Sequence, residues 1–262
     1  MPTLSDDLGT PVALPEPPRR IVSLVPSLTE ALADAVPGAL VGATDWCTHP
    51  ADLDVTRVRG TKNPDLRAVL GLEPDLVVAN KEENRELDVR RLRDAGAAVW
   101  VTDIESVPQA LASLARLLEL VGGGRPGWLV ESERVWGTPA PEAVARVAVP
   151  IWRDPWMVVG GSTFTSDLLA HVGLVNVFAG ADGRYPHVEL ERIDGCADVV
   201  LLPDEPYAFG PSDGPEAFAR TPTRCVDGRL ITWYGPSLVP AHAMLRALAA
   251  DLAPTAPEPQ RP

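Results

Sequence analysis

Short apolar runs alternate with stretches of helical periodicity over the first hundred residues. Residues 20–25 (RIVSLV) are apolar and rich in β-branched side chains, which favours a strand. Ser27, Thr29 and Glu30 then precede an Ala/Leu stretch, which is the pattern of a helix start. The alternation continues with strands predicted at 40–43, 76–79 and 98–101 and helices at 64–70 and 87–95. Strands and helices in this order predict a parallel sheet with helices packed against it.

The pattern changes to a long helical segment at residues 107–136. Glycines 122–124 and Pro126 interrupt this segment, so we expect a kink or a break there. A second series of strands and helices follows, at 145–151, 156–159, 163–171 (a helix), 190–195, 199–202, 230–233 (a strand) and 240–252 (a helix). The chain is therefore predicted to be an α/β protein with two Rossmann-like α/β lobes bridged by one long helix. The predicted parts are an N-terminal extension (1–19), an N-terminal lobe (20–106), the connecting helix (107–136), a C-terminal lobe (137–252) and a proline-rich tail (253–262).

Composition narrows the range of partners. The 262 residues include 23 Lys and Arg against 36 Asp and Glu, a net charge of −13, which is the wrong sign for binding a phosphate backbone. Nucleic acid is therefore excluded as a partner. No apolar run reaches the roughly 18–20 residues that cross a bilayer, so no membrane insertion is expected.

Two features predict a cytoplasmic location. The first 20 residues contain Asp6, Asp7, Glu16 and several prolines, where a signal peptide has a basic region followed by an apolar run. The three cysteines, Cys47, Cys196 and Cys225, are odd in number and widely spaced, which is typical of free thiols in a reducing compartment.

Aromatic residues recur where the predicted strands end. Ligands of open α/β sheets bind beyond the carboxyl ends of the strands. Trp46, Trp152, Tyr207 and Trp233 lie at such ends, although aromatic residues make up only 5% of the chain. Their broad apolar faces suit a large flat or conjugated ligand, while the alternative for each is that it covers the end of a core.

Charged residues at the same ends allow further interpretations. Arg153 is expected to pair with an anionic group of a ligand or to form a surface ion pair. Glu82 and Glu83 are adjacent and point in opposite directions in an extended loop, so they do not predict paired-carboxylate catalysis. The chain has no G-x-S-x-G motif, and no two of its histidines have metal-ligand spacing. We therefore predict no catalytic residue and no metal ligand, and an enzyme is the less favoured interpretation.

Several runs of sequence resemble one known family. These are RIVSLVPSLTEAL (20–32), LVGATDWCTHP (40–50) and VRGTKNPDLRAVLGLEPDLVVAN (58–80). They resemble the class III substrate-binding proteins of cobalamin, haem and iron-siderophore ABC importers, in which a single long helix bridges two α/β lobes. The motifs TDWC-x-x-P, GTK and TWYG are most similar to the cobalamin-binding type.

The resemblance implies that a large metal chelate binds in the cleft between the lobes without chemical turnover. No cofactor is predicted by name, and a corrinoid or haem is expected as the bound ligand. The implied ligand-binding residues are Trp46, Thr61, Lys62, Glu82, Glu83, Asn84, Trp152, Arg153, Tyr207 and Trp233. Two alternatives stay open: an intracellular enzyme or biosynthetic accessory protein that reuses the fold, and an importer component whose signal sequence lies upstream.

The resemblance also implies a protein partner, the permease of an ABC importer. Family members dock through one glutamate on each lobe, and the matching positions here are Arg67 and Glu191. An arginine that faces the arginines of a permease lowers affinity, so we expect conventional docking to be impaired.

Overall fold

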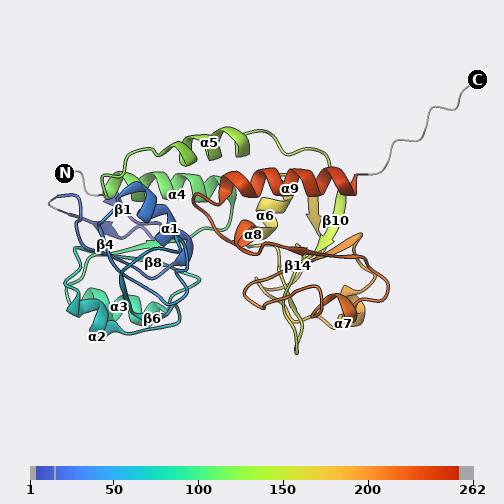
Figure 1. Cartoon of the computed structure of the whole chain (residues 1–262), viewed down its shortest axis with the longest axis horizontal. Coiled ribbons are helices and arrows are strands. Elements are labelled where there is room, and N and C mark those ends of the chain that lie inside the picture. Colours follow the sequence, from blue (N-terminus) through green and yellow to red (C-terminus); the bar gives the residue numbers. More distant parts are fainter. Residues whose placement is uncertain (1–3, 15, 254–262) are drawn as a thin grey trace, which may run out of the picture. The chain divides into compact units, whose positions relative to one another are not determined.

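The structure is a computed structural model that describes residues 4–14 and 16–253. Within these residues the chain divides into two compact units. Unit 1 comprises the chain up to Ile104, together with Pro108–Arg134 and Trp233–Leu238, and unit 2 comprises Glu105–Val107, Val135–Thr232 and the chain from Val239. Figure 1 shows the helices and strands of each unit. The tail predicted from 253 lies outside the described residues from 254 on.

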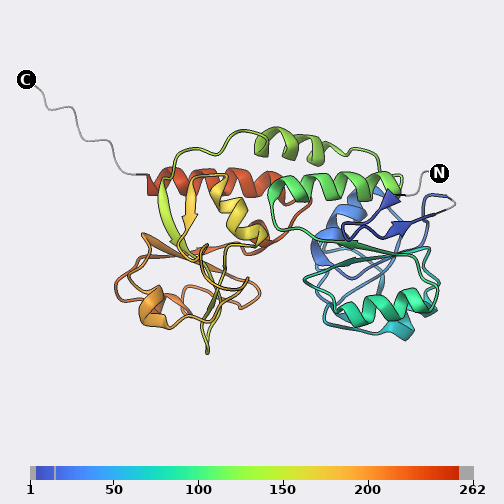
Figure 2. The same ribbon diagram turned by 180° about the vertical axis from the view of Figure 1, so that it is seen from behind.

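Unit 1 is built on a five-stranded parallel sheet of order β5-β4-β3-β8-β9. Its strands are β3 (Ile21–Ser23), β4 (Leu40–Ala43), β5 (Thr56–Arg57), β8 (Leu76–Asn80) and β9 (Val99–Thr102). Helices α2 (Leu66–Gly71) and α3 (Glu86–Asp94) cover one face, and α1 (Pro26–Ala35) and α4 (Val107–Leu120) cover the other (Figures 1 and 2). Because helices cover both faces, the inner strands are mostly apolar, and all five residues of β8 are buried, whereas both residues of the edge strand β5 are exposed.

A core of aliphatic side chains fixes α2 and α3 against this sheet. Val22, Val77 and Val99 from the strands pack with Val69 of α2 and Leu92 of α3. Two short hairpins complete the unit: β1 (Leu4–Ser5) with β2 (Pro11–Val12), and β6 (Arg59–Gly60) with β7 (Asn63–Pro64).

Unit 2 is built on a four-stranded parallel sheet of order β13-β10-β14-β15. Its strands are β10 (Ala145–Ala148), β13 (Leu174–Asn176), β14 (Val199–Pro203) and β15 (Thr223–Val226), and the hairpin of β11 (Pro150–Trp152) and β12 (Met157–Val158) follows β10. Helices α6 (Phe164–Ala170) and α9 (Leu238–Leu252) lie on one side of the sheet and α7 (Leu190–Ile193) on the other (Figures 1 and 2). Ala148, Val200 and Leu202 pack against Phe178 and Phe209 in the core.

Residues 107–136 contain the break expected at the glycines, and two other elements differ from the sequence prediction. Residues 107–136 form two helices, α4 and α5 (Gly127–Trp136), because Gly122 and Gly124 adopt positive φ angles of 74° and 64° between them. The strand predicted at 145–151 ends at Ala148 and resumes as β11 at Pro150, since proline has no N–H for the ladder.

The strand predicted at 230–233 is wrong. These residues form the helical turn α8 (Arg229–Thr232), in which the Thr232 N–H donates to the Gly228 carbonyl at 2.9 Å. The edge of the sheet is instead β15, whose residues 223–226 pair with β14. A short apolar run carries too few positions to distinguish a strand from a buried helical turn.

The acidic residues near the N-terminus have a structural role in unit 1. Asp6 is 4% exposed, and its carboxylate accepts the Leu8 and Thr10 N–H groups at 3.0 and 2.8 Å and the Arg93 guanidinium at 2.9 Å. Asp7 accepts from Ser113 of α4 at 2.6 Å. The segment thus closes the β1–β2 turn and fixes it to two helices.

A buried carboxylate fixes a loop of unit 2 in the same way. Asp194 follows α7 and accepts the backbone N–H groups of Ala219, Arg220 and Thr221 at 2.8–3.1 Å. Burial alone would raise the pKa of the Asp194 carboxyl, but these N–H groups outweigh burial, and the pKa lies below its ordinary value. The carboxylate is therefore charged in the folded protein at neutral pH.

We expect Asp6→Ala to lower the free energy of unfolding by about 3 kcal/mol, because it leaves buried N–H groups and the Arg93 guanidinium without their acceptor. Urea titration followed by circular dichroism measures this change. The matched control is Glu16→Ala, which removes an exposed ion pair of 3.9 Å and should change stability by less than about 0.5 kcal/mol. Equal effects of the two variants would contradict a structural role for Asp6.

The lowered pKa of Asp194 predicts an acid-dependent stability. Because its pKa is lower in the folded than in the unfolded protein, Asp194 stabilises the fold above the unfolded value of about 3.9, and this contribution is lost as pH falls through the folded pKa. Asp194→Asn should therefore be about 1–3 kcal/mol less stable than the parent at pH 7. Urea titrations at descending pH should show the difference shrinking below about pH 4, while exposed Asp182→Asn should follow the parent throughout.

Candidate functional site

Trp46 is the most exposed large apolar side chain of the described residues, at 65%. It lies in the loop that follows β4, and its indole nitrogen is so close to Gly60 of β6 that a Cβ there would lie 3.3 Å from it. Beneath it, the Cys47 thiol lies 3.0 Å from the Thr29 hydroxyl and 3.1 Å from the Thr44 hydroxyl. Burial raises the pKa of this thiol, so Cys47 stays neutral and anchors the loop.

Two further segments predicted from the sequence lie together in unit 1. The Thr61–Lys62 turn joins β6 to β7, and residues 82–84 follow β8. The Lys62 amine donates to the Glu82 carbonyl, and the Asn84 amide donates to the Thr61 carbonyl at 3.0 Å. These contacts fix the turn and the loop to each other.

A buried network that the sequence did not reveal positions the 82–84 loop. The Asn80 side-chain oxygen accepts the N–H groups of Glu82 and Glu83 at 2.8 and 3.1 Å. Its amide nitrogen donates to the Thr102 hydroxyl at 3.0 Å and to the Tyr234 hydroxyl at 2.9 Å. Burial raises the pKa of Tyr234 well above its ordinary value, so the phenol is neutral. Tyr234 is far from Asn80 in sequence, so no local pattern indicates this pairing.

The Asn84 side chain also occupies the crevice where the sheet of unit 1 changes direction. The chain runs from β3 outward through β4 and β5 and returns at β8, so the switch point lies between β3 and β8. There Asn84, which is 4% exposed, donates to the Leu24 carbonyl at 3.2 Å. Asn84 is therefore buried at this crevice, whereas Trp46 is exposed on the loop that follows β4.

Trp233 differs from the other predicted tryptophans because it is only 8% exposed. Its ring contacts His49 edge to face, with centroids 5.5 Å apart. Little of the indole surface is available for stacking, and we expect replacement of Trp233 to affect the stability of unit 1.

In unit 2, two aromatic residues meet at the switch point of the sheet. From β10 the chain adds β13 on one side and then β14 on the other, so the crevice lies between β10 and β14. Trp152 ends the hairpin strand after β10 and Tyr207 follows β14, and their rings are 5.5 Å apart in an edge-to-face contact. Trp152 is 44% exposed, so this pair, the Trp152–Tyr207 platform, offers an aromatic surface.

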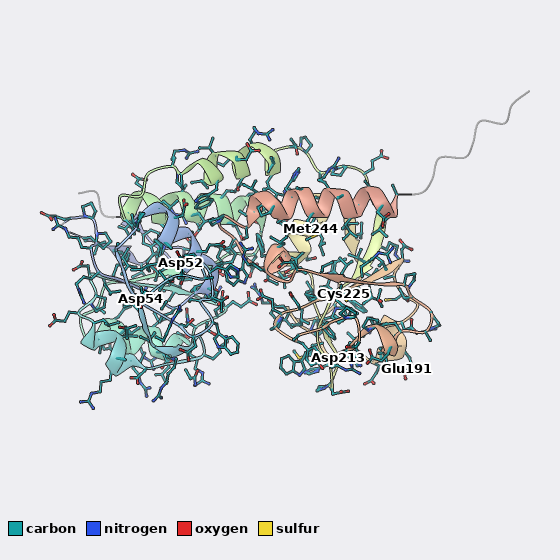
Figure 3. The ribbon with its side chains drawn as sticks, in the orientation of Figure 1. Asp52, Asp54, Glu191, Asp213, Cys225 and Met244 are labelled. Atoms are coloured by element: carbon teal, nitrogen blue, oxygen red, sulfur yellow. The ribbon has the colours of Figure 1, made fainter. Side chains whose placement is uncertain are left out.

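Arg153, predicted to meet a ligand anion or to form a surface ion pair, forms ion pairs with carboxylates of its own unit. Its guanidinium contacts Asp213 and lies 2.7 Å from a Glu216 carboxylate oxygen. The hydrogen bond that Arg153 donates to Glu216 is the main cause that raises the pKa of Arg153. Tyr207 donates its hydroxyl to Asp213 at 2.8 Å, which joins the ion pairs to the aromatic platform. Figure 3 shows Asp213 in unit 2.

The two positions matched to docking glutamates are both exposed on short helices. Arg67 lies on α2 of unit 1, and Glu191 lies on α7 of unit 2, where Figure 3 labels it. Among the described residues, no three His, Cys, Asp or Glu side chains form a group that could hold a metal ion. No helix in the same residues has the length and apolar character needed to cross a membrane.

Comparison with curated proteins establishes the family, although no family model matches the chain. An uncharacterised ABC transporter substrate-binding lipoprotein of Bacillus subtilis is 32% identical over 256 residues, which is 90% of this chain and 82% of the relative. The chain belongs to the ABC transporter substrate-binding proteins. A vitamin B12-binding protein of Salmonella typhi is 30% identical over 193 residues, covering 71% of this chain and 72% of the relative.

Solved structures share the fold of this substrate-binding protein. The periplasmic vitamin B12-binding protein of Vibrio cholerae superimposes with a TM-score of 0.72 at 18% identity, covering 90% of this chain and 98% of that one. A periplasmic haem-binding protein of Pseudomonas aeruginosa gives 0.71 at 20% identity, with coverage of 92% and 94%. The class III family and the α/β fold predicted from the sequence are thereby confirmed.

The predicted cytoplasmic location is wrong. The Bacillus relative is a lipoprotein, and the solved neighbours are periplasmic, which points to a place outside the cytoplasm. The acidic N-terminal residues misled the prediction because they belong to the folded unit: Asp6 and Asp7 are held by Arg93 and Ser113. The acidic character of these residues is therefore explained by their contacts within unit 1.

The Asn80 network predicts a specific dynamic effect. Asn80→Ala should increase the hydrogen-exchange rate of the Glu82 and Glu83 backbone amides by about tenfold or more, because each amide loses its acceptor. Tyr234→Phe removes one partner of Asn80 and should give a smaller increase together with a loss of about 1–2 kcal/mol in stability. Exchange measured by mass spectrometry should leave the centre of β8 unchanged. Unaltered exchange at Glu82 and Glu83 would show that the network does not position the loop.

Proposed function

We propose that this chain is the substrate-binding component of an ABC importer and holds a large metal chelate, such as a corrinoid, a tetrapyrrole or a siderophore complex, without transforming it. The observation that carries the proposal is the exposure of one tryptophan on each unit at the carboxyl ends of its strands. Trp46 is 65% exposed and Trp152 is 44% exposed, whereas Trp100 and Trp136 are buried at 0% and 3%. Exposed aromatic faces at these ends are surfaces for a large conjugated ligand.

The named ligands of the relatives support this class of substrate. They include vitamin B12-binding proteins among the curated relatives and haem-binding proteins among the solved structures. Both ligands are macrocyclic metal chelates with broad apolar surfaces, which suit contact with aromatic rings. The side chains described around Trp46 and the Trp152–Tyr207 platform contain hydrogen-bonding groups and ion pairs, which support binding.

Docking on an ABC permease is part of the proposal because the relatives are transporter components. Glu191 on α7 is the contact we propose for unit 2. Arg67 is exposed on α2, so the permease surface that meets it is expected to be acidic or neutral in place of basic.

Trp46→Ala and Trp152→Ala should each weaken chelate binding by about 5- to 150-fold, because each removes about 1–3 kcal/mol of stacking. Titration with cyanocobalamin and with haem, followed by quenching of protein fluorescence, measures the affinities. The matched control is Trp128→Ala on α5, whose indole donates to Asp34 at 2.8 Å on another part of unit 1. It should leave affinity unchanged.

Native mass spectrometry and an absorbance spectrum of the protein purified from its host test the proposal as a whole. A bound chelate is expected in both. Absence of binding to every chelate offered, by a protein whose melting curve is intact, would contradict the proposed function.

A further inference from the structure

The guanidinium of Arg153 is surrounded by acidic groups. Glu216 lies 2.7 Å away, Asp213 is in direct contact, and Asp154 lies 3.7 Å away. One positive and three negative groups leave two net negative charges beside the Trp152–Tyr207 platform. The only cation of this group is therefore more than neutralised before any ligand arrives.

The carboxylates are also more accessible than the cation they hold. The Arg153 side chain is 20% exposed, against 47% for Asp213 and 53% for Glu216. Both carboxylates are fixed, since Tyr207 donates to Asp213 at 2.8 Å and the Gly214 N–H donates to Glu216 at 2.5 Å. Arg153 lowers the pKa of Glu216, which keeps that group ionised at neutral pH. An approaching ligand meets fixed acceptors.

Three cations of unit 1 are engaged in a similar way. The Lys62 amine donates to the Glu82 carbonyl, and Lys81 pairs with Asp103 at 2.6 Å. Arg57 donates to the Cys47 carbonyl at 2.8 Å. These side chains support the loops beside Trp46, and each cationic group has a partner within the unit.

From these contacts we infer that the site selects chelates whose edges carry uncharged amides over chelates whose edges carry free carboxylates, with Asp213 and Glu216 as specificity-determining residues. The inference rests on the proposed function. Amide N–H groups of a corrinoid donate to the two fixed carboxylates, and hydrogen bonds to a charged acceptor are among the stronger ones. A propionate of haem brings a like charge to the same groups, and the Arg153 guanidinium beside them is already paired. Arg153 thereby holds the selective carboxylates in place and does not bind the ligand's anion.

The test compares two probes that differ in edge charge. These are cyanocobalamin and a cyanocobalamin derivative whose peripheral amides have been hydrolysed to carboxylates. Haem is the third probe. The parent protein should bind cyanocobalamin at least about tenfold more tightly than the carboxylate derivative, and added salt should strengthen binding of the derivative by screening repulsion.

The variant Asp213→Asn with Glu216→Gln removes both charges and retains oxygens that accept from Tyr207 and Gly214. It leaves Arg153 with Asp154 alone at 3.7 Å, which changes the net charge of the group from −2 to 0. Affinity for the carboxylate derivative and for haem should therefore rise by about five- to tenfold, and added salt should no longer strengthen their binding. The matched control, Asp52→Asn with Asp54→Asn, removes two charges from unit 1 (Figure 3) and should preserve the parent's preference.

Each outcome separates this inference from the proposed function. If the parent binds haem or the carboxylate derivative as tightly as cyanocobalamin, or if the double variant leaves the preference unchanged, the inference is overturned while chelate binding stands. If melting curves show folded protein and no probe binds, the proposed function fails and the inference fails with it.

Discussion

Burial of both faces of each parallel sheet is the constraint on which the rest of the molecule depends. Parallel strands are covered by helices, so the inner strands of both units form apolar core, and the ends of the strands lead into surface loops. The segments that follow β4 in unit 1 and β10 in unit 2 carry the exposed Trp46 and Trp152.

The two units use these ends differently. In unit 1 the crevice at the switch point is closed by buried amides, Asn80 and Asn84, which hold the neighbouring loop by its own backbone. In unit 2 the corresponding place holds the Trp152–Tyr207 platform with Arg153 and its carboxylates. A rigid loop and a fixed aromatic pair both lower the entropy that a binding surface loses when it captures a ligand.

Several charged side chains of this protein have a structural role. Asp6 and Asp194 are buried, and each organises several backbone N–H groups. Arg153 pairs with Asp213 and Glu216, which is the surface ion pair that the sequence left open beside a contact with a ligand anion. The formal charge of a side chain determines which groups it is able to bind. Its neighbours in the fold determine whether that charge is already paired.

The sequence by itself determined the α/β class, the positions of most buried strands and the family, because these depend on local apolar periodicity and on contiguous motifs such as 23–30 and 72–77. It also placed Trp46 and Trp152 at strand ends, since strand ends follow directly from the strands. Tertiary structure decided the rest: that 229–232 is helical, that Trp233 is buried, that Tyr234 supports Asn80, and that Arg153 is neutralised by Asp213 and Glu216. These outcomes depend on pairs of residues separated by up to 154 positions, and no local pattern records which distant side chain becomes a neighbour.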